Sequence, residues 1–319
     1  MKVIRIHEFG DTSVLKLEDI PQPAPAANQV LVHVKAVGVN PVDTYIRAGL
    51  YGPRHFPFTP GFDAAGIVES IGPDVSGAKP GDRVYIHGSI SGTYADYALC
   101  DASQVHPLPE NVSFELGAGI GVPYFTAYYA LAVRGQAHHG ETVFVHGASG
   151  GVGTAAVQIG RILGLRIIGT GGTDKGREHI RQQGAQYVLD HHDPRYLDDL
   201  MKITEGLGPD LILEMMANLN LGRDLKVLHK RGRVIVIGSR GSVDIDPRDA
   251  MSRNASILGM SSLNATPDDH RMCHAAIGAG LKQGVLKPVI GKTFSLAQAA
   301  QAHTAVLEPG ALGKIILLP

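Results

Sequence analysis

Short apolar runs separated by turn residues dominate the first third of the chain. They are VIRI (3–6), QVLVHVKAVG (29–38), AAGIVESIG (64–72) and DRVYIHG (82–88). Pro-Gly or Gly-Pro pairs at 60–61, 72–73 and 80–81 stand between them. Apolar runs of this length, bounded by Gly and Pro, are typical of β-strands. The pattern predicts a compact β-rich barrel with few helices in this region.

From about residue 122 the pattern changes to a repeated strand, glycine turn and helix. The candidate strands are ETVFVHG (141–147), RIIGTG (166–171), QYVLD (186–190), DLILEMM (210–216), RVIVIGS (233–239) and SILGM (256–260). Helical stretches such as TAAVQIGRILG and LGRDLKVLHKRG lie between them. Parallel neighbours need a crossover connection, and helices must cover both faces of such a sheet. An α/β fold with a doubly wound parallel sheet of the Rossmann type is therefore expected.

The last part of the chain predicts a helix at about 268–283 and a final apolar run, KIILLP, at 314–319. A short terminal strand of this kind is able to rejoin the first domain, which would make that domain discontinuous. We therefore divide the chain into a first part of the catalytic domain (1–121), a nucleotide-binding domain (122–261) and a C-terminal part of the catalytic domain (262–319).

Length and composition agree with two globular domains. The chain has 319 residues, of which 44% are hydrophobic and 18% charged, and it lies far from the composition of disordered chains. A formal net charge of -1 gives no overall field for nucleic acid or anionic lipid, so phosphate recognition has to be local. No secretory signal or membrane span is visible, and only two cysteines occur. We expect a cytoplasmic protein without a disulfide framework.

The strongest local signal is HGASGGVGTAAVQIG at 146–160, which follows an apolar run and precedes a helical pattern. Ala148, Gly150 and Gly153 occupy the three positions of a G-x-G-x-x-G register, with alanine in place of the first glycine. Such a loop makes a tight turn and lets the backbone approach a pyrophosphate at helix N-terminal amides. Ser149 can add a hydroxyl donor. The alternative is a packing turn without a ligand, which the strand before and the helix after disfavour.

The stretch GTGGTDKGR (169–177) bears on the choice between NADPH and NADH. NAD sites usually carry an acid after the second strand, which accepts from the ribose hydroxyl. Here that turn carries Gly171 and Gly172, followed by Lys175 and Arg177, and cations with small residues suit a 2′-phosphate. NADPH is therefore favoured. Two alternatives stay open: an inward-pointing Asp174 would favour NADH, and both cations could simply be a solvated helix start.

Taken together, these motifs resemble the zinc-less medium-chain dehydrogenase/reductases, and within them the quinone oxidoreductases of the zeta-crystallin type. The similarity covers nearly the whole chain and includes the spacing Gly150-Gly151-x-Gly153-x4-Gln158-x2-Arg161, with Phe144 where leucine is preferred. The segments that carry it are VNPVDTYIRAG (39–49), TPGFDAAG (59–66), GVPYFTAYYAL (121–131), VHGASGGVG (145–153), GRVIVIGSRG (232–241) and GKIILL (313–318).

The resemblance implies a GroES-like β-barrel catalytic domain formed by both chain ends, a Rossmann domain between them, and an active cleft where they meet. It implies that Asn40, Tyr45 and Thr126 lie near the nicotinamide and the substrate, with Tyr45 also touching the cofactor. The expected cofactor contacts are otherwise Ser149, Gly150, Gly151, Val152, Gly172, Lys175, His191, Asn220, Gly238, Ser239, Arg240 and Lys314. For Lys314 the simpler alternative is an exposed lysine at a strand end, and for Tyr45 a packing tyrosine.

Some relatives depart from this chain at the phosphate contacts. They carry a tyrosine at His191 and a lysine at Gly176, which shifts the expected phosphate clamp without removing its basic character. Zinc-dependent relatives have a cysteine at Asn40 and a histidine at Phe62. Neither Asn nor Phe supplies a thiolate or an imidazole, so we expect no catalytic metal. The pairs His138-His139 and His191-His192 lack the usual metal-ligand spacing, and we interpret them as solvated or packing residues.

A quinone is electron-poor, so hydride from a nicotinamide needs alignment and a dry cleft more than a Lewis acid. The resemblance implies an NADPH-dependent reductase of small quinones, and this chemistry is compatible with the missing zinc ligands. An alkenal or enoyl reductase acting on a C=C bond remains the main alternative, because pocket shape separates the two. An RNA-binding or structural crystallin-like role is a minor alternative, since no basic stripe interleaved with aromatics is present. The resemblance also implies a homodimer or homotetramer, with SILGM as a candidate edge strand.

Overall fold

The computed structural model describes residues 1–310 and 312–319 and separates into two compact units. The first unit contains Met1–Val122 and Gly278–Pro319, and the second contains Pro123–Ile277. The first division lies one residue from the boundary expected from the sequence. The second division, after Ile277, lies inside a helix and comes later in the chain than the boundary expected after residue 261. The catalytic and cofactor-binding roles of the two units remain a prediction.

The first unit is built on a seven-stranded sheet and a small two-stranded sheet. The large sheet has the order β14-β15-β3-β4-β5-β7, with β6 also paired to β3. The strands of the unit are β1 (Lys2–Arg5), β2 (Lys16–Asp19), β3 (Gln29–Val39), β4 (Asp63–Ile71), β5 (Arg83–His87), β6 (Tyr97–Asp101), β7 (Val105–Pro107), β14 (Ile290–Ser295) and β15 (Lys314–Leu318). The C-terminal strand β15 runs antiparallel to β3, with Ile316 opposite Gly38. This confirms that the chain end rejoins the N-terminal part.

Strand β3 is the centre of this sheet because it pairs with β4, β6 and β15. Its alternate residues Val30, Val32 and Val34 are buried in one apolar cluster. Period-2 burial is what one face of a strand produces, and β-branched side chains fit a pleated surface. Strand β3 ends at Val39, and Asn40 follows it directly.

Helices of the first unit are short. They are α1 (Pro41–Arg47), α2 (Phe114–Gly117) and α10 (Ala299–Ala305), with single 3-10 turns at Thr12–Val14, Ala102–Gln104 and Leu296–Gln298. Helix α1 begins because Asn40 adopts an extended N-cap conformation and Pro41 takes the first helical position, where its missing N–H costs nothing. Helices α3 (Gly121–Tyr128) and α9 (Pro267–Lys282) each contain a division between the units.

The second unit is a six-stranded, all-parallel sheet in the order β10-β9-β8-β11-β12-β13. The strands are β8 (Thr142–Val145), β9 (Arg166–Thr170), β10 (Tyr187–Leu189), β11 (Leu211–Glu214), β12 (Arg233–Val236) and β13 (Ser256–Gly259). Counted within the unit, this is the order 3-2-1-4-5-6 of the Rossmann fold. The doubly wound sheet expected from the sequence is confirmed.

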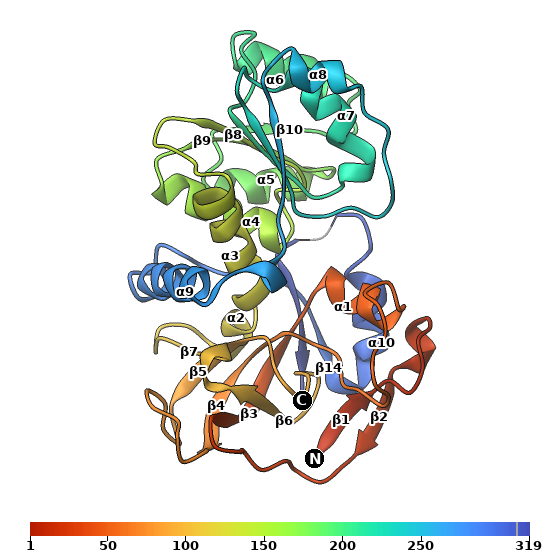
Figure 1. Ribbon diagram of the computed structural model, residues 1–319, viewed down its shortest axis with the longest axis vertical. Helices are drawn as coiled ribbons and strands as arrows, with labels where there is room; N and C mark the ends of the chain where they lie inside the picture. Colours follow the sequence, from red (N-terminus) through yellow and green to blue (C-terminus); the bar gives the residue numbers. More distant parts are fainter. Residues whose placement is uncertain (311) are drawn as a thin grey trace. The chain divides into compact units, whose positions relative to one another are not determined.

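Helices cover both faces of this sheet (Figure 1). They are α4 (Gly151–Ile162), α5 (Asp174–Gln183), α6 (Tyr196–Ile203), α7 (Ala217–Val227) and α8 (Pro247–Met251), with a π-helical turn at Tyr129–Arg134 and a 3-10 turn at Ser262–Asn264. Ile168 belongs to the apolar cluster under α6 and α7, whereas its neighbour Ile167 packs against Gly160 of α4. Residues alternate between the two faces, as a doubly covered sheet requires. Within residues 1–310 and 312–319, no helix has the length and hydropathy needed to cross a bilayer.

Candidate functional site

The glycine-rich loop joins strand β8 to helix α4. Gly150 is the N-cap of α4, and no side chain caps the helix. The first amides of a helix have no partner within the helix, and they carry the positive end of its dipole. Gly151 and Val152 are partly exposed at this end. The loop therefore offers backbone N–H donors to an anion, as the sequence predicts.

The tight turn of this loop is made by Gly147, not by the residue in the register of the first glycine. Gly147 has a φ of 58°, a conformation that favours glycine, whereas Ala148 is fully buried. At the third position, a Cβ on Gly153 would lie 2.4 Å from the Cα of Ala148 and 2.5 Å from the oxygen of Gly147. Gly153 thus permits close packing of the helix on the loop. Sequence reasoning missed Gly147, although it precedes Ala148 directly.

Strand β9 ends at a turn that lacks a carboxylate facing inward. Asp174 has a side chain that is 99% exposed and is paired with Arg177, so it points outward. Arg177 also pairs with Asp190, whose oxygen lies 2.6 Å from Nη1, and donates to the oxygen of Gly171. Two carboxylates therefore balance the charge of Arg177. Lys175 is exposed, and among the described residues no carboxylate pairs with it.

His191 lies against the same turn. Its Nδ1 is 3.4 Å from the hydroxyl of Thr170, and a Cβ on Gly172 would lie 2.7 Å from its Nε2. Burial, followed by the charge of His192, lowers the pKa of His191. Its imidazole is neutral at pH 7 and contributes hydrogen bonds rather than charge. The structure thus brings Gly172 and His191 together, and it leaves Lys175 as the unpaired cation of this turn.

A buried cluster that the sequence did not predict lies where β8 and β11 end. His146 Nε2 is 2.8 Å from Asp224 Oδ1 and 3.3 Å from Glu214 Oε2, and all three side chains are buried. Burial raises the pKa of both carboxyls and lowers the pKa of His146. Potential metal-ligand atoms of the three residues lie within 4.8 Å of one another. The available signal was His146 near the end of ETVFVHG and Glu214 inside the apolar run DLILEMM; Asp224 lies outside both runs.

The cluster positions one further predicted cofactor residue. Asn220, in α7, donates from Nδ2 to Glu214 Oε1 at 3.2 Å, and its oxygen accepts from Arg223. The expected contacts Gly238, Ser239 and Arg240 follow strand β12, and the Gly238 amide donates to the oxygen of Glu214 at 3.2 Å. These residues therefore gather at the ends of β11 and β12, as expected for a strand-end site. Thr126 lies in α3 and is buried.

In the first unit, Asn40 lies in a buried polar network. Its Nδ2 donates to Asp63 Oδ2 at 2.9 Å, and its Oδ1 accepts from Lys314 Nζ. Lys314 Nζ also pairs with Asp63 Oδ2 at 2.7 Å, and Asp63 Oδ1 accepts from the Val122 amide. Both ends of the Asn40 amide are thus held in one orientation. The charge of Lys314 is neutralised by Asp63.

Lys314 was expected either at the cofactor phosphates or as an exposed residue. Its side chain is 5% exposed, so the alternative of an exposed strand-end lysine is wrong. The reason is local packing: Gly38 has no Cβ, and a Cβ there would lie 2.8 Å from Cε of Lys314. Contact of Lys314 with phosphates stays a prediction, and two of its three ammonium donors already have partners.

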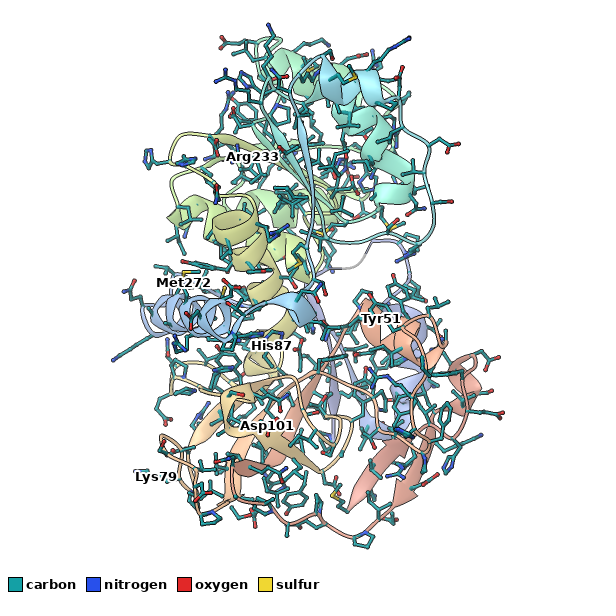
Figure 2. The ribbon with its side chains drawn as sticks, in the orientation of Figure 1. Tyr51, Lys79, His87, Asp101, Arg233 and Met272 are labelled. Atoms are coloured by element: carbon teal, nitrogen blue, oxygen red, sulfur yellow. The ribbon has the colours of Figure 1, made fainter. Side chains whose placement is uncertain are left out.

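Tyr45 projects from α1 and is half-buried. Its ring is stacked on that of Tyr51, with centroids 6.5 Å apart and an interplanar angle of 5°. Tyr51 is 53% exposed and is labelled in Figure 2. The pair presents an aromatic surface at the partly solvated side of the helix, suited to a flat ring.

A second chain of hydrogen bonds leads away from Asn40. The backbone N–H of Asn40 donates to Asp43 Oδ2 at 2.8 Å, and the hydroxyl oxygen of Tyr94 lies 3.1 Å from the same carboxylate oxygen. The His303 Nε2 is 3.0 Å from the Tyr94 oxygen, and Arg47 donates to His303 Nδ1 at 3.1 Å. Because a guanidinium only donates, His303 carries its proton on Nε2 and Tyr94 donates to Asp43.

The charges of this chain follow from burial. Burial lowers the pKa of His303 to about 3, with a further contribution from Arg47, so the imidazole is neutral. Burial also raises the pKa of Asp43 to about 7, against the opposing hydrogen bond from Asn40. The carboxyl of Asp43 is therefore close to half-protonated at neutral pH. Sequence reasoning missed Asp43, Tyr94 and His303, although Asp43 is two residues from Tyr45.

Two family models match the chain. The alcohol dehydrogenase GroES-like domain matches residues 26–110, and the zinc-binding dehydrogenase matches residues 151–276. The second match covers the Rossmann part and contains neither Asn40 nor Phe62. The GroES-like match lies within the first unit, and it includes most strands of the seven-stranded sheet.

Individual relatives match over the whole chain. The quinone oxidoreductase of Homo sapiens is 48% identical over 100% of this chain and 98% of its own length. The solved structure of an Escherichia coli quinone oxidoreductase complexed with NADPH has a TM-score of 0.92, 29% identity and complete coverage of both chains. An NAD-dependent alcohol dehydrogenase structure has a TM-score of 0.93, 27% identity and the same coverage.

Two structural features agree with this full-length sequence identity. They are the strand order of the second unit and the Gly150-Gly151-x-Gly153 loop that begins α4. The chain therefore belongs to the medium-chain dehydrogenase/reductase family, in its branch of quinone oxidoreductases of the zeta-crystallin type.

Proposed function

We propose that this protein reduces small quinones, ortho-quinones among them, with NADPH and without a catalytic metal. The observation that carries the proposal is the uncapped N-terminus of α4, preceded by the turn at Gly147 and placed beside the β8–β11 switch point. Ligands of open α/β sheets bind at this point. The family to which the chain belongs, and the NADPH complex of the Escherichia coli relative, support the same reading.

The residues of the second unit fit a dinucleotide. The amides of Gly151 and Val152 would hold the pyrophosphate. Gly150, whose own amide donates to the Gly147 oxygen at 3.2 Å, would let the backbone come close to it, and the hydroxyl of Ser149 lies beside Gly176 in the first turn of α5. The strand-end residues Gly238 to Arg240, with Asn220, would line the nicotinamide side. When bound, the reduced nicotinamide supplies the hydride.

Selectivity for NADPH over NADH would rest on Lys175. Arg177 is balanced by Asp174 and Asp190, and His191 is neutral, so neither supplies net charge to a 2′-phosphate. An exposed, unpaired Lys175 does. No carboxylate of this turn points inward to accept from a ribose hydroxyl, which is the device of NAD sites.

On the substrate side, we propose contacts from Tyr45 and Asn40. The Tyr45 hydroxyl would donate toward negative charge that develops on the quinone oxygen. Asn40 is 3% exposed and is oriented by Lys314 and Asp63, which leaves it one N–H for the substrate. Asn40 and Phe62 lack the thiolate and imidazole donors that zinc requires, and an electron-poor quinone needs no Lewis acid.

The test compares consumption of NADPH with 1,2-naphthoquinone and with a simple enone, using protein dialysed against EDTA. We expect turnover of the quinone at a clearly higher kcat/KM than the enone, and no effect of the chelator. A wide preference for the enone would instead assign the protein to the C=C reductases. Loss of activity on chelation would contradict the metal-free part of the proposal.

An oligomer is proposed through the free edge of the Rossmann sheet. Strand β13 is the last strand in the order, and its Ile257 is 39% exposed. Open edges invite pairing between copies. Light scattering of the purified protein should give the mass of a dimer or a tetramer, and substitution of Ile257 by Lys should lower it.

A further inference from the structure

Two neighbouring histidines of the second unit converge on the turn that follows strand β9. A Cβ on Gly172 would lie 2.5 Å from Nε2 of His192 and 2.7 Å from Nε2 of His191. Both ring nitrogens therefore face the same point beside Gly172. The two rings lie edge to face, with centroids 4.7 Å apart and an interplanar angle of 75°. From sequence spacing alone, the pair has the pattern of solvated or packing residues.

One carboxylate holds the histidine segment against this turn. Asp190 Oδ1 accepts from the backbone N–H of His192 at 2.9 Å, and Asp190 Oδ2 lies 2.6 Å from Nη1 of Arg177. Arg177 in turn donates to the backbone oxygen of Gly171. The position of the histidines relative to the turn is thus fixed through Asp190 and Arg177. These contacts use neither of the two Nε2 atoms.

The hydrogen-bonding role of His191 follows from its other ring nitrogen. Its Nδ1 lies 3.4 Å from the hydroxyl oxygen of Thr170, and that oxygen already accepts from the Gly147 amide at 3.1 Å. The hydroxyl proton of Thr170 is therefore available to Nδ1. A neutral imidazole that accepts at Nδ1 carries its own proton on Nε2. We therefore assign His191 as an N–H donor at the point beside Gly172.

Both ring edges are accessible to a ligand. His191 and His192 are exposed residues, and within residues 1–310 and 312–319 neither Nε2 has a hydrogen-bond partner. Gly172 places no side chain between them. The Nε2 of His192 donates in one tautomer of the neutral ring and in the protonated ring. Two donors that face one point suit an anion with several acceptor oxygens, such as a phosphate.

The charges around the two imidazoles do not oppose an anion. The charged and titratable groups nearby are Asp174, Lys175 and Arg177 of α5, Asp190 and Asp193 of the histidine segment, and His146. Asp174 and Asp190 pair with Arg177, and Asp193 lies 3.6 Å from Nε of Arg195. In the part of the chain that the structure describes, no carboxylate forms an ion pair with either imidazole. Lys175 adds an unpaired positive charge to the same turn.

We propose that His192 is a specificity-determining residue, whose Nε2 binds the 2′-phosphate of NADPH together with Nε2 of His191. The inference rests on the proposed function, because it places the adenosine end of the cofactor at the turn after β9. His191 acts as a neutral donor. Histidine is the side chain that ordinarily gains its charge between pH 8 and pH 5, so His192 donates at high pH and adds a cation as the pH falls. The preference for NADPH over NADH therefore increases from pH 8.5 to pH 6.5.

The test is fluorescence titration of the full chain with NADPH and with NADH, each at pH 8.5 and pH 6.5. The readout is the ratio of the two dissociation constants, because a general loss of structure weakens both cofactors alike. His192→Gln keeps an amide donor near the position of Nε2 but takes up no charge. His192→Phe keeps a ring but has neither donor nor charge. His138→Gln is the matched control, since His138 is an exposed histidine of the same unit.

The variants separate the hydrogen bond from the charge. At pH 8.5 we expect His192→Gln to keep the wild-type preference for NADPH and His192→Phe to lower it about threefold or more, as for one lost hydrogen bond. At pH 6.5 the wild-type preference should be about fivefold higher than at pH 8.5, as expected when a neutral donor becomes a charged one. Neither variant of His192 should show this increase. His138→Gln should behave as the wild type does at both pH values.

Three results would overturn the role of His192 alone. They are a His192→Phe ratio equal to that of the wild type, a wild-type ratio that does not rise at pH 6.5, and an equal change in the control His138→Gln. Each of them leaves wild-type binding of NADPH intact, so the reductase proposal would stand. A wild-type protein that binds neither cofactor would instead overturn the proposed function, and the role of His192 with it.

Discussion

Lys314, at the start of β15, donates a buried hydrogen bond to the side chain of Asn40, although 274 residues separate the two positions. The same ammonium pairs with Asp63, which accepts from the other end of the Asn40 amide. A buried ion pair adds little stability in itself, but loss of one partner leaves an uncompensated charge. The network therefore acts mainly to fix the orientation of Asn40.

Substitution of Lys314 by Met should lower the free energy of unfolding by about 3 to 5 kcal/mol, because Asp63 is left buried without its cation. The double variant Lys314→Met/Asp63→Asn should recover part of this loss. Lys292→Met is the control, since Lys292 forms an exposed pair with Glu308 and should change stability by less than about 1 kcal/mol. Urea unfolding measures all four proteins. If Lys314→Met were as stable as the control Lys292→Met, the claim that the substitution leaves a buried, uncompensated carboxylate would be contradicted.

Asp43→Asn should change how stability depends on pH. Burial raises the pKa of Asp43 from 3.8 to about 7 in the folded protein. A raised folded pKa gives stability that is complete below pH 4 and is lost as the pH rises through 7. Relative to the wild type, the variant should therefore gain stability between pH 5 and pH 8, by an amount on the order of a few kcal/mol. If the free energies of unfolding of the variant and the wild type differed by the same amount at every pH from 5 to 8, Asp43 would be ionised throughout that range.

Two glycines of the loop should respond differently to alanine. A Cβ at Gly153 would overlap the backbone of Ala148, so Gly153→Ala should both destabilise the fold and abolish NADPH binding. A Cβ at Gly150 meets only the oxygen of Gly147, at 3.7 Å. Gly150→Ala should fold as the wild type does but bind NADPH at least about tenfold more weakly, because its methyl group stands where the pyrophosphate approaches the backbone. Thermal unfolding and NADPH titration separate the two effects.

Lys175→Gln should raise the KM for NADPH about tenfold and leave the KM for NADH unchanged, because only NADPH carries the 2′-phosphate. A charge-assisted hydrogen bond of this kind contributes about 1.5 to 3 kcal/mol. Lys226→Gln, at another exposed position of the same unit, is the matched control. Equal changes with both cofactors would remove Lys175 from the phosphate contacts.

The Rossmann unit was largely predictable because each of its strands is an apolar run between turn residues. ETVFVHG and RVIVIGS predicted β8 and β12 to within a few residues. The short strands β6, β7 and β14 were not predicted, since polar residues such as Lys292 interrupt the β14 pattern. Helix α1 was also missed, although the Asn40-Pro41 pair is a helix-start signal.

The sites were predictable only where the signal is local. The loop 147–153 is continuous in sequence and was found, apart from the role of Gly147. The network of Asn40, Asp63 and Lys314 joins three distant segments, and no spacing rule connects them. The same holds for His146, Glu214 and Asp224, which meet only because β8 and β11 become neighbours in the sheet.

The central claim is that the amides at the start of α4 hold a dinucleotide with a 2′-phosphate. Equilibrium titration of the wild-type protein with NADPH and with NADH, followed by nicotinamide fluorescence, tests it most directly. We predict saturable binding of NADPH that is at least about tenfold tighter than that of NADH, as expected for one charged contact. Equal or tighter binding of NADH would contradict the assignment of Lys175, and no binding of either would contradict the cofactor site itself.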